Sequence, residues 1–197
     1  YIHPKDRSVR VLFGDAATAT VISAARPGAR IIATEVGTDG SGCNNLIVPI
    51  GGARRPSRAE SPEECCDENG SIRSDANLFM DGPELFAFTL KRVPELVNRL
   101  LAKAGIAADE VDSFVFHQAN AFMNEHLRTK MRLPKEKVPL LLDDVGNTVS
   151  NTIPLTLSRI APMLLPGNKV VLTGFGVGYS WGACLVEWGE IDVSNES

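Results

Sequence analysis

Apolar positions in the first quarter of the chain follow a strand-like pattern. Short runs in which apolar or β-branched residues alternate with small or polar ones are typical of strands. Such runs occupy residues 9–15, 17–25, 30–40 and 45–52. The pattern therefore predicts four strands in this part of the chain.

The character of the chain changes between residues 53 and 77. Charged and polar residues dominate this stretch, which also contains two prolines. Long segments without periodic apolar residues are uncommon inside compact domains. We therefore expect a polar surface excursion at about 53–77, which could cap the entrance to a substrate site, rather than a packed element.

A helical period begins after this excursion. Apolar residues recur at steps of three and four, so they share one helix face. We expect the helix to end at Gly105, and Pro94 inside the pattern predicts a kink or a split. The predicted face consists of Phe86, Leu90, Val93, Val97, Leu100, Leu101 and Ala104.

The second half of the chain alternates strand and helix patterns. Strand patterns occupy residues 111–116, 169–175 and 179–188, and helix patterns occupy 119–131 and 151–165. Strands that are apolar on both faces must be covered on both sides. The sequence therefore predicts a layered α/β fold in which helices flank a mixed sheet.

Composition narrows the class of protein. The chain has 197 residues, of which 44% are hydrophobic and 22% charged, and its net charge is −4. This acidic balance does not favour nucleic acid or an anionic membrane surface as a partner. No apolar run reaches the roughly 18 residues of a membrane span, and no secretory signal is recognisable. We expect a cytoplasmic protein without a membrane span.

The cysteine spacing and the first residue each bear on what kind of chain this is. Cys43, Cys65, Cys66 and Cys184 lack the spacing of a zinc site or a disulfide framework, so we expect reduced thiols and no metal site. The chain begins at Tyr1 rather than Met. We therefore expect an engineered start, a processed product or a fragment.

Three loops carry candidate chemistry. His117 ends the predicted strand 111–116, Asn147 lies in "DDVGNTVSN", and "GFGVGYSWG" spans residues 174–182. Strand ends on one side of an α/β sheet converge on one crevice, where an imidazole N–H and a carboxamide N–H would bind an oxyanion. Taken singly, each loop also fits a structural role, and no helix follows the glycine turn as a dinucleotide site requires.

Four motifs together resemble a known family. "VLFGDAATATV", "HQAN", "GNTVSNTIP" and "GFGVGYSWGACLVEW" follow one another as in ketoacyl-acyl-carrier-protein synthase III, of the thiolase superfamily. The step of 30 residues from His117 to Asn147 also resembles the family's catalytic His-to-Asn spacing. The resemblance implies that residues 1–197 form a thiolase-like C-terminal domain, about half of such an enzyme.

The resemblance implies a decarboxylative Claisen condensation in the initiation of fatty acid synthesis. Its substrates would be an acyl-coenzyme A and malonyl-acyl-carrier protein, with no permanently bound cofactor and a homodimer as the full enzyme. His117 and Asn147 would stabilise the enolate that forms when malonate loses CO2. The backbone N–H of Val177, in a turn shaped by Phe175 and Gly176, would form a second oxyanion hole.

The resemblance also assigns residues that contact substrate and carrier. Arg7 would stack near the coenzyme A adenine, Phe86 and Met123 would line the pantetheine tunnel, and Asn120 would contact substrate. The alternatives are a surface arginine and ordinary core residues. A basic cluster could steer an acidic carrier protein, although a solvated helix end and loop is the favoured alternative. Its members are Arg128, Lys130, Arg132, Lys135 and Lys137.

The chain departs from the family in two respects. The nucleophilic cysteine should lie upstream of residue 1, so we expect either a longer enzyme or a separate N-terminal chain that carries it. Pro83 and Phe122 stand where better-known members carry Asn and Arg. These departures leave two alternatives open, a synthase III-like acyltransferase of secondary metabolism and a non-catalytic partner subunit. Acyl chain length is not encoded in this half.

Overall fold

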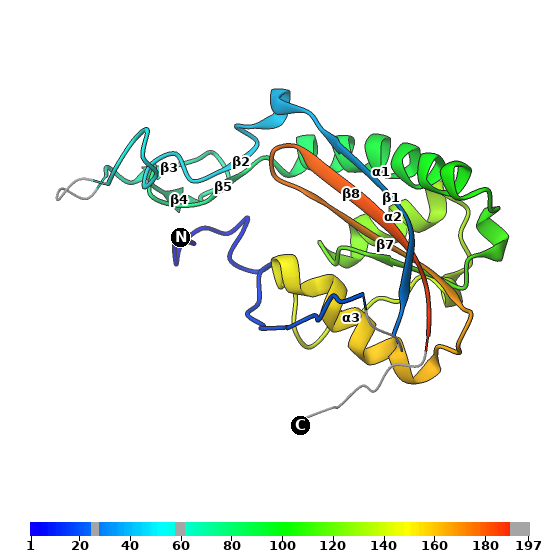
Figure 1. The fold of residues 1–197 in the computed structure, drawn as a ribbon. Helices are drawn as coiled ribbons and strands as arrows, with labels where there is room; N and C mark the ends of the chain where they lie inside the picture. The colour runs from blue at the N-terminus through cyan, green and yellow to red at the C-terminus, as the bar shows by residue number, and fades with distance from the viewer. Residues whose placement is uncertain (25–27, 58–61, 190–197) are drawn as a thin grey trace.

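The computed structural model describes residues 1–24, 28–57 and 62–189. Its centre is a mixed sheet of four strands in the order β1-β8-β7-β6 (Figure 1). β8 runs antiparallel to both β1 and β7, whereas β6 runs parallel to β7. The bounds are Arg30–Thr38 for β1, Ser113–Phe116 for β6, Lys169–Gly176 for β7 and Ser180–Glu187 for β8.

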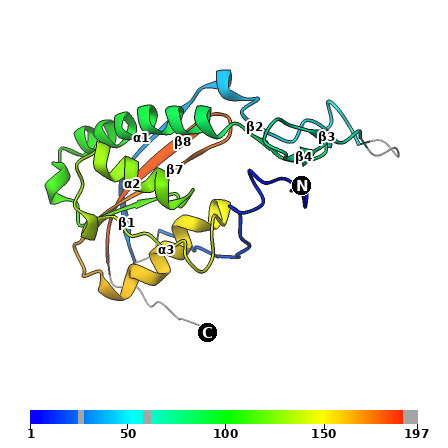
Figure 2. The same ribbon diagram turned by 180° about the vertical axis from the view of Figure 1, so that it is seen from behind.

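Helices α1 (Gly82–Ala104) and α2 (Ala121–Lys130) cover one face of this sheet (Figure 2). The larger apolar core lies between them and the strands. It joins buried residues of α1 and α2 to the inward-facing residues of β6, β7 and β8, among them Val97, Leu127, Phe114, Val171 and Leu185.

Helix α3 (Thr152–Ile160) covers the opposite face, where a smaller core joins it to β6, β7 and β8. The predicted helix reaches residue 165, but α3 ends at Ile160 and a 3-10 turn, Ala161–Met163, follows it. Pro162 has no backbone N–H to donate, so it cannot continue the helical hydrogen bonds. The sheet therefore lies between two helical layers, which confirms the predicted α/β fold class. Other 3-10 turns span Gly40–Gly42, Ala108–Glu110, Lys135–Lys137 and Val149–Asn151.

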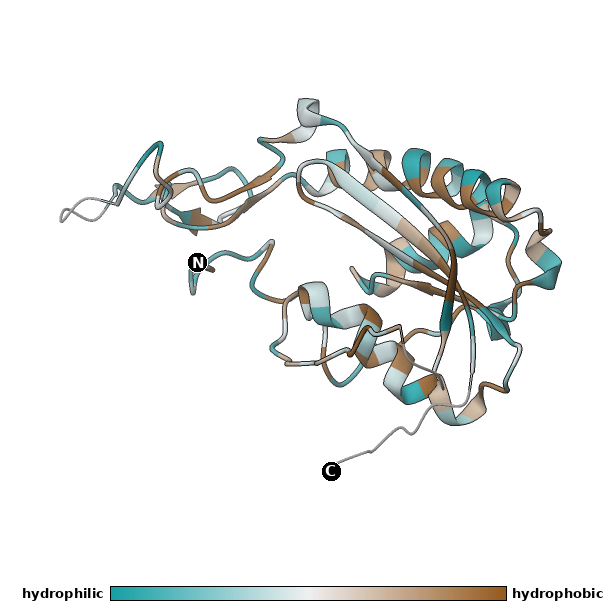
Figure 3. Cartoon of the chain, in the orientation of Figure 1, coloured by the Kyte–Doolittle hydropathy of each residue, from teal (hydrophilic) through white to brown (hydrophobic). Residues whose placement is uncertain are grey.

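Helix α1 has the boundaries that its sequence predicts. The Asp81 side chain accepts a hydrogen bond from the Glu84 N–H at 3.0 Å, and Gly105 ends the helix with a left-handed φ of 68°. The predicted split at Pro94 is wrong, since α1 continues through it. The apolar residues face the sheet (Figure 3), although Phe86 and Leu90 are only partly buried.

The predicted strands at 9–15 and 17–25 are wrong in the part that the structure describes. Residues 9–12 form turns, and only Phe13 makes a bridge, to Asn147. A strand must pair with another strand, and residues 17–24 form no strand in the structure. Val21 and Ile22 are instead 92% and 82% exposed. Residue 25 lies outside the described residues.

Residues 45–57 and 62–80 leave the sheet as an extended arm (Figure 1). Its strands are short: β2 (Leu46–Ile47) pairs with β5 (Phe79–Met80), and β3 (Cys65–Cys66) pairs with β4 (Ile72–Arg73). The predicted strand at 45–52 is therefore reduced to two residues. Residues 58–61 of the predicted excursion lie outside the described residues.

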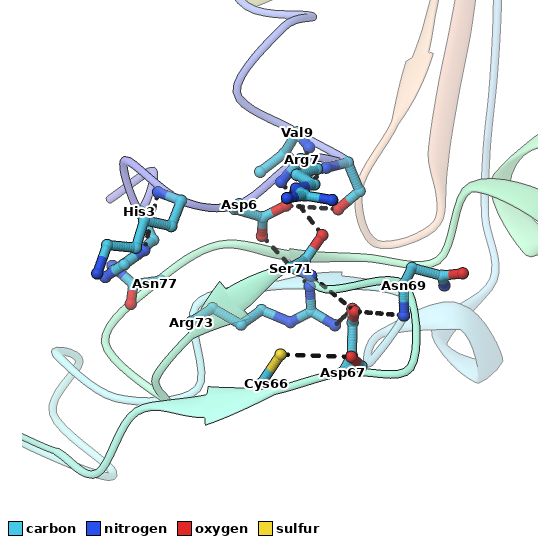
Figure 4. A network of polar contacts seen from close by, with 12 residues as sticks. His3, Asp6, Arg7, Val9, Cys66, Asp67, Asn69, Ser71, Arg73 and Asn77 are labelled. Atoms are coloured by element: carbon cyan, nitrogen blue, oxygen red, sulfur yellow. Dashed lines mark hydrogen bonds and ion pairs between the residues drawn. The ribbon is translucent and has the colours of Figure 1, made fainter.

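The β3–β4 hairpin of the predicted excursion packs against the N-terminal segment. Arg73 contacts the Asp6 carboxylate at 3.3 Å and the Asp67 carboxylate at 2.9 Å, which fastens the hairpin to the N-terminal segment (Figure 4). Asp6 is 1% exposed and also accepts hydrogen bonds from Ser8 and Val9. A polar segment can pack when its charges are paired in this way.

Candidate active site

His117 directly follows β6 in the chain, and its ring lies beside Thr152, the first residue of α3. Its backbone N–H donates to the Thr173 carbonyl of β7 at 2.8 Å, so the sheet fixes where its side chain starts. The ring Nδ1 lies 2.8 Å from the Thr152 hydroxyl. The Phe175 ring packs edge-on against the imidazole, with centroids 5.4 Å apart.

Burial controls the charge of His117. It lowers the pKa of the imidazole from 6.5 to about 4, because the charged form loses its hydration, and a hydrogen bond to the Val149 backbone opposes this. The ring is therefore neutral at pH 7. A neutral imidazole has one N–H donor and one lone pair.

Asn147 is held by its own backbone and by its neighbours. Its N–H donates to the Leu12 carbonyl at 2.9 Å, and its carbonyl accepts from the Gly14 N–H at 3.0 Å. A Cβ on Gly14 would lie 1.8 Å from the Val145 carbonyl oxygen, so this close approach requires glycine. The "LFGD" segment thus anchors the Asn147 loop.

The side chain of Asn147 has a defined orientation. Its Oδ1 accepts a hydrogen bond from the Val149 N–H at 2.9 Å. The amide NH2 must then point away from Val149, and it makes no hydrogen bond with any residue that the structure describes. Asn147 therefore offers donors and not an acceptor.

Val149 links the two side chains. Its N–H orients Asn147, and its backbone also hydrogen-bonds to His117. Val149 has φ of 56°, a left-handed conformation that costs energy in a β-branched residue. The structure thus brings His117, Asn147 and Phe175 to one place. Sequence analysis missed Val149 and Thr152, although a hydroxyl at a helix start near the motif was a signal.

The glycine turn lies between β7 and β8. Gly176 is the last residue of β7, and Val177 is exposed in the turn that follows. Phe175 connects this turn to His117 through the ring contact. The role of the Val177 backbone N–H in a second oxyanion hole stays a prediction.

The predicted substrate residues fall in two separate places. Arg7 lines an open cavity of about 410 Å³ between the N-terminal segment and the turn of the β3–β4 hairpin. Phe86 packs against Phe122 with centroids 5.4 Å apart, beside the buried Met123. Asn120 has a structural function, since its Oδ1 accepts from the Met123 N–H at 2.7 Å and caps α2.

Two of the five residues of the predicted basic patch, Arg128 and Lys137, already have partners. The Arg128 guanidinium donates to Glu125 at 2.8 Å and to the Leu133 carbonyl at 2.9 Å. Lys137 donates to the carbonyls of Asp109 and Val111. Lys130 and Arg132 make no ion pair with the described residues.

No cysteine of the described residues has the surroundings of a nucleophile. Cys43, Cys65 and Cys66 are exposed and lie outside α-helix starts. Cys184 lies inside β8, and burial raises the pKa of its thiol, which disfavours the reactive thiolate. Within residues 1–24, 28–57 and 62–189, no cluster of three metal-ligating side chains occurs.

Comparison with known proteins identifies the family. Residues 1–40 match the model of 3-oxoacyl-[acyl-carrier-protein] synthase III, and residues 101–188 match the model of its C-terminal region. The chain belongs to the synthase III family. The second match contains His117, Asn147 and the glycine turn, and the first contains Arg7 and the segment that anchors Asn147.

Curated synthase III sequences align along nearly the whole chain. The protein from Staphylococcus saprophyticus is 37% identical over 94% of this chain and 52% of its own length. One from Streptomyces coelicolor is 34% identical over 97% of this chain and 56% of its own. The chain thus spans about half the length of these relatives.

Solved 3-oxoacyl-(acyl-carrier-protein) synthase structures share the fold. A crystal structure of a 3-oxoacyl-(acyl-carrier-protein) synthase III superposes with a TM-score of 0.85 at 45% identity, over 95% of this chain and 57% of the other. The Burkholderia xenovorans enzyme superposes with a TM-score of 0.76 at 38% identity, over 98% and 54%. Among the described helices, none combines the length and apolarity that a bilayer crossing needs.

Proposed function

We propose that this chain supplies the enolate-stabilising half of a β-ketoacyl-acyl-carrier-protein synthase III. The observation that carries the proposal is the arrangement at Val149, which holds a neutral His117 and an outward-pointing Asn147 amide. Two neutral donors beside one another suit an oxygen that becomes negative during a reaction. The condensation would join an acyl-coenzyme A starter to malonyl-acyl-carrier protein.

The donors act when malonate loses CO2. The C–C bond to the carboxylate breaks, and its electron pair moves toward the thioester carbonyl, whose oxygen becomes an enolate. His117 and Asn147 donate hydrogen bonds to that oxygen. Removal of one such donor typically slows a reaction by about 10²–10³-fold. The enolate carbon then attacks the acyl thioester, and the cysteine thiolate departs.

The cysteine nucleophile is proposed to lie outside this chain, in an N-terminal half or a separate subunit. The surroundings of Cys43, Cys65, Cys66 and Cys184 support this assignment. The acyl-enzyme oxyanion would be bound by the Val177 N–H, in the turn of Phe175 and Gly176. Four unpaired thiols suit a reducing cytoplasm, where the full enzyme would act as a homodimer.

Substrate is proposed to enter past the β3–β4 hairpin. Lys5, Arg7 and Arg10 line the cavity there and suit the phosphate groups of coenzyme A. The pantetheine arm would pass Phe86 and Met123. Lys130 and Arg132, rather than the paired Arg128, would meet the acidic carrier protein.

Two other functions remain candidates. Pro83 and Phe122 favour a synthase III-like acyltransferase of secondary metabolism with a different carrier, because Phe122 packs on Phe86 where the substrate arm would pass. A non-catalytic partner subunit is less favoured, because a structural subunit has no need for two oriented donors.

The test measures CO2 release from malonyl-acyl-carrier protein by the chain joined to its cysteine-bearing half. His117→Ala and Asn147→Ala are each expected to lower the rate by about 10²–10³-fold. Asn98→Ala, an exposed residue of α1, is the matched control. Unchanged release in both site variants would sink the catalytic proposal and leave the partner-subunit function.

A further inference from the structure

A second cavity lies at the C-terminal end of α2, away from His117. It measures about 180 Å³ and is lined by residues from the middle of α1, from β6 and from the turn that follows α2. The ten residues of α2 rise about 1.5 Å each, so about 15 Å of helix separates this cavity from the helix end that follows His117. The cavity is therefore distinct from the candidate active site.

The floor of this cavity is apolar. Val97 of α1 and Phe114 of β6 are fully buried, and Leu101 and Leu133 are each 5% exposed. The partly buried Met131 also lines the cavity, and a methionine side chain adapts to irregular space. A floor of this kind favours contact with an aliphatic group over contact with water.

The rim of the cavity carries charge of one sign. Lys130 and Arg132 line it, are exposed, and make no ion pair with the described residues. None of the residues that line the cavity is acidic. Two free cations beside an apolar floor suit a ligand with one apolar end and one anionic end.

The backbone of Arg132 adopts a conformation that glycine favours. Its φ is 54°, in the left-handed region that usually holds glycine just after a helix. The Arg132 N–H donates to the Thr129 carbonyl at 3.1 Å and keeps it there. The Leu133 N–H donates to the Arg128 carbonyl at 3.0 Å and completes the turn. A side chain at a position where glycine is less strained suggests that the side chain itself is used.

We propose that this cavity binds a short aliphatic carboxylate. The chain lies on the apolar floor, and Lys130 and Arg132 donate hydrogen bonds to the carboxylate. One water molecule takes about 30 Å³, so a cavity of about 180 Å³ holds about six non-hydrogen atoms, as in the chain of a six-carbon acid. The site does not depend on the proposed function. If that function holds, the bound acid competes with the carrier protein for the same two cations.

The test uses the complete enzyme, with the cysteine-bearing half present, and methionine labelled with 13C at the methyl group. Met131 lines the cavity, Met123 lies in the proposed pantetheine path, and Met163 is 71% exposed after α3. Loss of a resonance in Met131→Leu assigns the reporter. Hexanoate should shift the Met131 resonance with a Kd of about 1 mM and leave the Met163 resonance unchanged.

Affinity should follow the length and the charge of the ligand. Each methylene from butanoate to hexanoate should tighten binding about fourfold, because it is buried on the floor. Octanoate should gain little more, because the cavity is then full. Hexanol has no charge for the two cations and should bind about tenfold more weakly than hexanoate.

Two variants test the rim. Arg132→Gly removes the guanidinium without straining the backbone, and Lys130→Met removes the ammonium. Each should weaken hexanoate binding about tenfold. Lys135→Met is the matched control, because Lys135 belongs to the same basic patch but does not line the cavity, and it should bind hexanoate as wild type does.

Three results would overturn the proposal. They are a Met131 resonance that hexanoate does not move, a shift confined to Met123, and equal affinity of wild type and Arg132→Gly for hexanoate. CO2 release plays no part in this measurement, so failure of the proposed function would leave its outcome unchanged and the two failures are distinguishable.

Discussion

A histidine with a pKa of about 4 stays neutral across the pH range in which most enzymes work. Burial produces this shift, and the same burial strengthens any hydrogen bond that the ring gives to substrate. The motif around His117 predicts its place at the end of a strand. It does not predict Val149, because a β-branched residue in a left-handed conformation contradicts its own backbone preference.

Stability should depend on pH through His117. The unfolded ring binds a proton near pH 6.5 and the folded ring only near pH 4, so the native state loses stability as pH falls through this window. The loss should reach at most about 3 kcal/mol at pH 4. Denaturant titration at pH 7.5 and pH 4.5 measures the free energy of unfolding at each pH. In His117→Gln the difference between the two values should be smaller, because the titrating ring is gone. An equal pH dependence in both proteins would contradict the account.

Replacement of Val149 by glycine tests the backbone strain. Glycine adopts a φ of 56° without cost, so Val149→Gly should raise the free energy of unfolding by about 1 kcal/mol. The valine side chain is 58% exposed, and little packing is lost with it. Denaturant titration measures the change. A clear loss of stability would mean that Val149 is not strained.

The apolar periods along the chain correctly predict the helices and strands that bury one of their sides against the sheet or the helices. α1, α2, β1, β6, β7 and β8 lie where their apolar periods place them, because each period matches one side of the sheet. The segments at 9–15 and 17–24 have a similar composition, but within them only Phe13 pairs with another backbone as a strand does. Strand propensity does not encode a partner, so it fails there.

The β3–β4 hairpin depends on one charged residue. Arg73 neutralises the buried Asp6 and also pairs with Asp67, as Figure 4 shows. Arg73→Met should leave Asp6 buried without a cation and release the hairpin from the N-terminal segment. Limited proteolysis should then cut residues 67–70 faster than in wild type, whereas Arg54→Met, an exposed residue of the same arm, should not change the rate. Equal resistance of both variants would show that the backbone contacts alone hold the hairpin.

Across the whole molecule, several large apolar side chains remain uncovered. They are found in the 17–24 segment, on the edge strand β1 and after α3, and they include Val21, Ile22, Val36, Met163 and Leu165. Large apolar side chains left uncovered in this number suit an interface with another protein segment. Relatives are about twice as long as this chain, so the cysteine-bearing half is the partner that we propose for these surfaces.

The chain alone should therefore bind a dye that reports apolar surface, and addition of the cysteine-bearing half should displace the dye as the two associate. Fluorescence titration with size-exclusion chromatography measures both events. A monodisperse monomer that binds no dye would contradict the need for a partner half.

The central claim is that His117 and Asn147 act together on one oxygen. The most direct measurement is a double-mutant cycle on CO2 release from malonyl-acyl-carrier protein by the complete enzyme. We predict that His117→Ala and Asn147→Ala each slow CO2 release strongly. The double variant should slow release less than the product of the two single effects, because both donors stabilise the same negative oxygen. A double variant whose release rate equals the product of the two single effects, or equals that of wild type, would contradict the account.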